Sequence, residues 1–195
     1  MKHEIRAGTP AEVRADESTI TVSGYAAVFN EETTIGDFFR EVIKPGAFTE
    51  AVKNDDVVFL VNHAGLPLAR TRSGTLKLTE DAKGLRIDSE LDLSDPDVQR
   101  IKVKMERGDM DKMSFAFYPE VQEWDESSDT ELPLRSITKA SLVDVSIVNF
   151  PAYEASEIGL RSLQEHRSKN EINNDHSRLK KRMEMNLALR RIGEH

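Results

Sequence analysis

The sequence predicts a mainly β fold with flanking helices (α+β), in which an antiparallel barrel, closed or nearly closed, carries its helices on the outside. Three observations lead to this prediction. Short segments with strand-like apolar patterns, separated by turn residues, recur from residue 19 to residue 150. Only two segments within that span have helical spacing, and no internal repeat is present. With 38% apolar and 32% charged residues, a chain of 195 residues can bury one core beneath a solvated surface.

The strands are predicted from two kinds of pattern. Residues 19–23, Thr-Ile-Thr-Val-Ser, alternate polar and apolar side chains, as in a strand with one buried face. Residues 57–61, Val-Val-Phe-Leu-Val, form a continuous apolar run, as in a strand buried on both faces. Residues 80–83, Glu-Asp-Ala-Lys, form the turn of a hairpin. The predicted strands span residues 19–29, 57–61, 74–78, 84–91, 112–118, 134–138 and 142–150.

Two helices are predicted between these strands. A short one lies within residues 45–53, which open with Pro-Gly-Ala-Phe. A longer one begins at Asp95 and Pro96, a good pair for the N-cap and first helical positions, and stops at Gly108. The apolar residues on one face of this longer helix are Val98, Ile101 and Met105.

The C-terminal part of the chain differs in composition from the rest. Residues 164–195 contain eight Lys or Arg against five Asp or Glu, a net charge of +3, and no Pro, Phe, Trp or Tyr. We therefore predict one domain over residues 1–163 and a polar, basic, helical tail over residues 164–195, with a third helix at residues 176–192.

Composition also excludes several classes of function. The net charge of −8 provides no basic field for nucleic acid or an anionic membrane. The absence of cysteine excludes disulfides, a thiol nucleophile and Cys-based metal sites. No apolar run approaches the roughly 20 residues of a membrane span, and the first residues lack the apolar segment of a signal peptide. We expect a soluble, cytoplasmic protein.

Three residues in the body are candidates for catalysis. His63 is the only histidine away from the terminal segments, and it directly follows the predicted buried strand, in which Asn62 comes after the apolar run at 57–61. Ser114 alternates with Met113 and Phe115, so it should point outward from a strand whose large side chains point inward. Each has a plainer interpretation, as a structural or exposed histidine and as a small outer residue of an amphipathic strand.

Asp144 is the third candidate because it interrupts an otherwise apolar strand. A buried carboxylate needs a partner, and orienting an imidazole would supply one, although a charge that protects a sheet edge is the plainer interpretation. Serine, histidine and aspartate together are the parts of a Ser-His-Asp set, which is defined by geometry and not by order along the chain. The residues alone leave these alternatives open.

Five short blocks in order carry a resemblance to a known family. They lie at residues 24–30 (GYAAVFN), 41–48 (EVIKPGAF), 62–63 (NH), 113–117 (MSFAF) and 144–153 (DVSIVNFPAY). In these blocks the chain strongly resembles the tailed-bacteriophage prohead serine proteases, capsid maturation proteases related in fold to the herpesvirus assemblins. The resemblance runs from about residue 2 to residue 160 and implies an assemblin-like β-barrel.

The resemblance implies that Ser114 is the nucleophile, that His63 is the general base and that Asp144 orients the histidine. The family often has Glu where Asp144 stands and Gly where Ala116 stands, and Ser146 is a rival for a supporting role. The resemblance implies no metal and no organic cofactor. Candidate donors for the oxyanion are backbone N–H groups or the arginines Arg70, Arg72 and Arg107.

The family also implies a biological role. Its members act in the bacterial host cytoplasm, inside the procapsid, on the scaffolding protein or the scaffold segment of the major capsid protein, and commonly on themselves. Herpesvirus relatives require dimers, so a homodimer is a candidate assembly. Two rivals remain: a non-catalytic scaffolding component with the same fold, and a serine hydrolase that acts on a small ester.

Overall fold

The computed structural model describes residues 3–128, 131–150, 160–172, 177–178 and 180–181. The chain forms two compact units, Met1–Ile158 and Gly159–His195. In the second unit, residues 160–172 form a helix, which crosses the position predicted as the domain boundary. That boundary stays a prediction, and most of the helix predicted at 176–192 lies outside the described residues.

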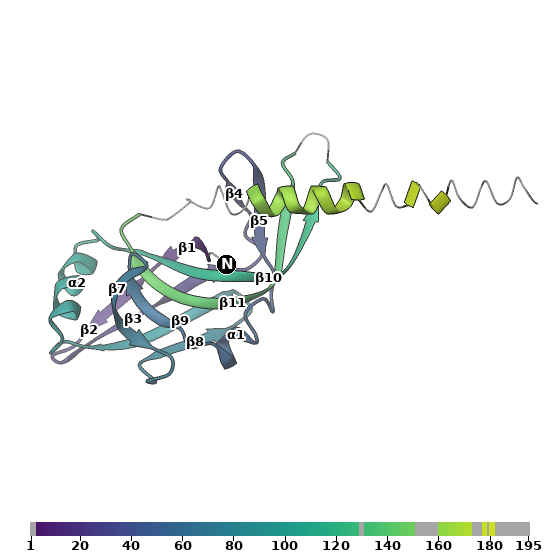
Figure 1. Ribbon diagram of the computed structural model, residues 1–195. Coiled ribbons are helices and arrows are strands. Elements are labelled where there is room, and N and C mark those ends of the chain that lie inside the picture. The colour runs from purple at the N-terminus through teal and green to yellow at the C-terminus, as the bar shows by residue number, and fades with distance from the viewer. Residues whose placement is uncertain (1–2, 129–130, 151–159, 173–176, 179, 182–195) are drawn as a thin grey trace, which may run out of the picture. The chain divides into compact units, whose positions relative to one another are not determined.

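The first unit consists mainly of strands, with two helices between them (Figure 1). The mainly β fold class with flanking helices is therefore confirmed. The elements are β1 (Glu4–Pro10), β2 (Glu12–Ala15), β3 (Thr19–Val28), β4 (Thr33–Ile35), β5 (Phe39–Ile43), α1 (Ala51–Asn54), β6 (Val58–Val61), β7 (Ala64–Arg70), β8 (Leu76–Glu80), β9 (Gly84–Asp92), α2 (Pro96–Glu106), β10 (Lys112–Asp125) and β11 (Leu134–Val148).

These strands form two sheets. The larger runs in the order β1-β10-β11-β5-β4, with β6 pairing β11 and β7, and the smaller is the antiparallel sheet β2-β3-β9-β8. One core cluster joins their apolar faces, including Phe115 and Phe117 of the larger sheet with Ile20 and Leu85 of the smaller. The closed antiparallel barrel is not confirmed, because the described strands lie in two sheets and β11 pairs with β5 and β6 in parallel.

The long strand β11 organises the larger sheet. It pairs with β10 in antiparallel fashion along its whole length, as Figure 1 shows. Its first part, from Leu134 to Ile137, lies beside β5, and its later part, from Asp144 to Ile147, lies beside β6. The prediction of two strands here was wrong: the polar residues between them remain paired with β10, with Lys139 opposite Val121.

The helices differ in how well the sequence predicted them. The Asp95 carboxylate accepts a hydrogen bond from the Asp97 backbone N–H at 2.8 Å, and Pro96 opens α2, as expected of an N-cap. Gly108 follows the end of α2 with a φ of +77°, a conformation that favours glycine. The helix predicted at residues 45–53 is only the short α1, because turns occupy residues 45–50.

Four charged side chains of the larger sheet, two from β1, one from β5 and one from the start of β11, are buried together. Arg6 binds Glu4 and Glu41, and Arg135 binds the same two carboxylates, at distances of 2.5 to 2.9 Å. Arg135 is fully buried, yet the set is neutral overall and multiply hydrogen-bonded. Burial acts to raise the pKa of Glu4, but Arg135 and Arg6 outweigh it and hold that pKa below its usual range.

Candidate active site

Neighbouring strands of the larger sheet carry Ser114 and Asp144. Ser114 lies on β10 directly opposite Ser146 of β11, and Ala116 lies opposite Asp144. Because residues two apart along a strand share a face, Ser114, Asp144 and Ser146 project from the same side of the sheet. Phe115 projects from the other side, into the core.

His63 reaches this face from a tight turn. Val61 of β6 pairs with Ala64 of β7, so Asn62 and His63 form a two-residue hairpin loop. Both have positive φ, +51° and +57°, as type I′ turns require of their central residues. The Asn62 backbone N–H donates to the Ile147 carbonyl oxygen at 3.0 Å, which ties the turn to β11.

The structure brings the three candidate residues together in a linear array. The His63 Nδ1 atom lies 2.6 Å from Asp144 Oδ1, and Nε2 lies 2.7 Å from Ser114 Oγ. The Ser114 hydroxyl also has the Arg6 carbonyl oxygen as an acceptor at 2.8 Å. This connectivity, from carboxylate to imidazole to hydroxyl, is the one by which an imidazole removes a proton from a serine nucleophile.

Burial around the array differs from what the pattern suggested. Ser114 was expected on the outer face of an amphipathic strand, but its side chain is fully buried. His63 Nε2 and the Arg6 carbonyl both contact the hydroxyl, so this face of β10 is covered as well as the face toward the core. Asp144 is 3% exposed and lies on a strand paired on both sides, which excludes the interpretation as an edge charge.

Ser146 joins the array as a fourth polar side chain. Its hydroxyl donates to Asp144 Oδ1 at 2.8 Å and accepts from the His63 backbone N–H at 3.2 Å. The arginines considered as oxyanion donors have other partners. Arg70 and Arg72 pair with Asp56, and Arg107 pairs with Asp109.

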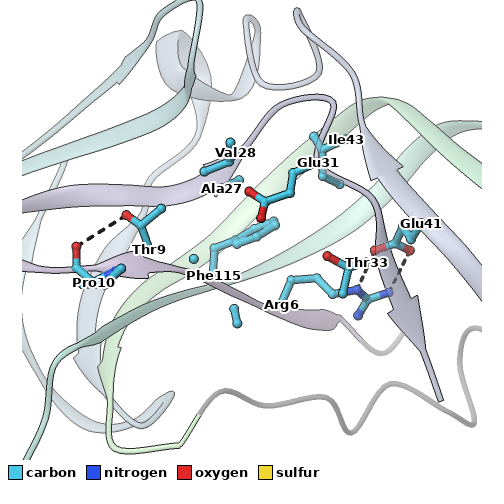
Figure 2. A pocket seen from close by; sticks show the side chains of 12 residues that line it. Arg6, Thr9, Pro10, Ala27, Val28, Glu31, Thr33, Glu41, Ile43 and Phe115 are labelled. Carbon is cyan, nitrogen blue, oxygen red and sulfur yellow. Dashed lines mark hydrogen bonds and ion pairs between the residues drawn. The ribbon is translucent and has the colours of Figure 1, made fainter.

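Among the cavities that the described residues line, two lie near these strands. One, of about 290 Å³, is lined by Arg6, Glu41 and Phe115 (Figure 2). It lies on the Phe115 face of β10 and therefore away from the Ser114 hydroxyl. The other is a cleft of about 530 Å³ between the β6–β7 turn and α2, and Asn62 and Ala64, which flank His63, line it.

The described residues contain neither a metal-binding cluster nor a membrane-spanning helix. There, no group of three or more His, Cys, Asp or Glu side chains could hold a metal ion. In the same part of the chain, no helix is both long and apolar enough to cross a membrane.

Comparison with known proteins agrees with the resemblance in the sequence. The profile of the Caudovirus prohead serine protease family matches residues 9–170. The prohead protease of Enterobacteria phage HK97 is 32% identical over 141 residues, which are 69% of this chain and 57% of that relative. The chain thus spans a little over half the length of this relative.

A solved structure has a similar fold. The capsid assembly protease of bacteriophage T4 matches with a TM-score of 0.51 and 9% sequence identity, over 77% of this chain and 98% of that one. The family profile covers well over half of the sequence, including His63, Ser114 and Asp144. The chain therefore belongs to the Caudovirus prohead serine protease family.

Proposed function

We propose that the chain is a serine endopeptidase of phage head maturation. It cleaves the scaffolding protein, or the scaffold segment of the major capsid protein, and also itself, inside the procapsid in the host cytoplasm. The observation that carries this proposal is the array of Asp144, His63 and Ser114, with contacts of 2.6 and 2.7 Å, in a chain of the prohead protease family.

In the first half of the reaction, Ser114 Oγ attacks the carbonyl carbon of the scissile peptide bond. Rotation about the Cβ–Oγ bond turns the hydroxyl proton from the Arg6 carbonyl toward Nε2 of His63, which accepts it as the Oγ–carbon bond forms. Asp144 accepts the Nδ1–H hydrogen bond throughout and stabilises the imidazolium. The imidazolium then protonates the leaving amine as the carbon–nitrogen bond breaks, which leaves an acyl-enzyme.

In the second half, water replaces the amine. His63 removes a proton from the water as its oxygen bonds to the acyl carbon, and the ester bond to Ser114 then breaks. The proton returns to Ser114 Oγ, and the carboxyl product leaves. The cleft lined by Asn62 and Ala64 is our candidate for holding substrate side chains, since these residues flank His63.

Co-expression with the capsid protein of the same genome tests the proposal. We expect a shortened capsid or scaffolding protein by intact mass with the unaltered chain, and full-length protein with Ser114→Ala. Ser89→Ala is the matched control, because Ser89 is a buried, hydrogen-bonded serine in the other sheet. Processing that persists with Ser114→Ala, or full-length proteins in shells that contain the unaltered chain, would favour a non-catalytic scaffolding role.

A further inference from the structure

Ser146 has three close contacts with the two residues that support Ser114. Its hydroxyl donates to Asp144 Oδ1 at 2.8 Å, accepts from the His63 backbone N–H at 3.2 Å and lies 3.3 Å from His63 Nδ1. Ser146 is fully buried, so no bulk water substitutes for these partners. A serine hydroxyl has one proton to donate, and here it donates that proton in a hydrogen bond to the carboxylate of Asp144.

The contact with the His63 backbone acts on a part of the chain that needs support. Asn62 and His63 both adopt the left-handed conformation, which residues other than glycine adopt infrequently. The direction of the imidazole follows from this backbone conformation. Ser146 provides a side-chain acceptor for the His63 N–H, while the Ile147 carbonyl accepts from the Asn62 N–H.

The contact with Asp144 fixes the other end of the array. The Ser146 hydroxyl and His63 Nδ1 both approach the same carboxylate oxygen, Oδ1, at 2.8 and 2.6 Å. Two donors that converge on one oxygen hold the carboxylate in one orientation. That orientation keeps Oδ1 opposite Nδ1, which leaves Nε2 free to accept the Ser114 proton.

We infer that Ser146 is a positioning residue of the active site. Its one hydroxyl couples the backbone of the His63 turn to the Asp144 carboxylate, and so sets the imidazole against Ser114. The expected effect on kcat rests on the proposed function, whereas the expected ordering of His63 rests on geometry alone. The geometry does not favour Ser146 as the nucleophile. Its hydroxyl faces Nδ1, the nitrogen that is hydrogen-bonded to Asp144, while Ser114 faces Nε2.

Kinetics on a peptide that spans the mapped cleavage site test the first consequence. Small displacements of catalytic groups reduce rates by up to about 100-fold, so we expect Ser146→Ala to lower kcat by about 10- to 100-fold with KM nearly unchanged. Ser146→Thr keeps the hydroxyl, and β-branched residues suit strands, so it should restore most of kcat. Ser89→Ala, the buried-serine control, should match the unaltered chain.

Proton NMR tests the second consequence without any turnover. In the Ser114→Ala variant, the His63 Nδ1–H proton should give a sharp downfield resonance, since Asp144 accepts from it in a buried site. Adding Ser146→Ala should broaden or shift that resonance, whereas adding Ser89→Ala should not. Thermal unfolding of each variant shows that the protein compared is folded.

The possible failures are distinguishable. An unchanged kcat in Ser146→Ala, or an unchanged Nδ1–H resonance, overturns the positioning role and leaves the proposed function standing. Cleavage that survives Ser114→Ala but is lost in Ser146→Ala overturns both the positioning role and the assignment of Ser114 as the nucleophile, and makes Ser146 the nucleophile. If the unaltered chain cleaves nothing, the proposed function fails, and the NMR comparison still decides whether Ser146 orders His63.

Discussion

Replacing Asp144 with Asn separates the charge of the carboxylate from its shape. In a triad, an amide that turned its NH₂ group toward Nδ1 would impose the tautomer with its proton on Nε2, which cannot accept from Ser114. Here two donors, His63 Nδ1 and the Ser146 hydroxyl, converge on Oδ1. An amide placed there satisfies both only when its carbonyl oxygen takes the Oδ1 position. We therefore expect Asp144→Asn to keep the productive tautomer and to lose only the negative charge.

The size of the loss follows from the separation of the charges. With Nδ1 and Oδ1 2.6 Å apart, the centres of the imidazolium and carboxylate charges are about 4 Å apart, and at an effective dielectric constant near 20 their attraction is about 4 kcal/mol. That attraction favours the state in which His63 carries the Ser114 proton. Its loss corresponds to a decrease in kcat of about 10³-fold.

The assay is steady-state cleavage of the mapped peptide by Asp144→Asn, Asp144→Ala and the double variant Asp144→Asn/Ser146→Ala. We expect the decrease in kcat of the double variant to exceed the product of the two single decreases. Without the Ser146 hydroxyl, the amide at position 144 is free to rotate and to present its NH₂ group to Nδ1. Thermal unfolding checks that all three are folded. Activity of Asp144→Asn within threefold of the unaltered chain would refute the role of the charge. A loss as great as that of Asp144→Ala would refute the retained tautomer.

Two further predictions concern stability. Arg135→Met leaves Glu4 buried with fewer cations, so urea unfolding at pH 7 should show a loss of about 3–5 kcal/mol. In the unaltered chain the lowered pKa of Glu4 adds stability above the usual carboxyl pKa, and that stability is lost as the pH falls through the lowered value. The deficit of Arg135→Met should therefore shrink as the pH falls below the usual carboxyl pKa, and a deficit independent of pH would contradict this account. Asp95→Ala removes the N-cap acceptor of α2 and should cost about 1 kcal/mol with cleavage unchanged; an unaltered melting temperature would count against the cap.

The sequence predicted those helices and strands that are determined by residues close together in the chain. The cap at Asp95 and the stop at Gly108 set the ends of α2, and the alternation after Thr19 indicated β3. The pairing of β11 with β5 and β6 has no local signal, because parallel partners are joined by long connections and share no turn. The prediction divides the single strand β11 because Lys139 and Ser141 are polar. A polar side chain breaks an apolar run without breaking the backbone hydrogen bonds beside it.

The candidate active site was likewise predictable from the sequence only in part. The sequence singled out His63, Ser114 and Asp144 from their types and surroundings, and five ordered blocks added the family. The burial of Ser114 could not be predicted, because the groups that cover it come from β1 and from the β6–β7 turn. Nor does a sequence pattern show that the Arg6 carbonyl faces the hydroxyl, since every residue has a carbonyl.

The register between β6 and β11 sets the distances on which the proposed chemistry depends. Val58 lies beside Asp144 and Val61 beside Ile147, so β6 ends level with the strand segment that carries Asp144 and Ser146. A slip of one residue would move the turn by about 3.3 Å and reverse the faces of β6 relative to β11. That displacement exceeds the 2.7 Å between His63 and Ser114, so the array exists in one register only. The apolar residues of β6 and β11 thus do more than form a core: by specifying this register, they bring His63 to Asp144.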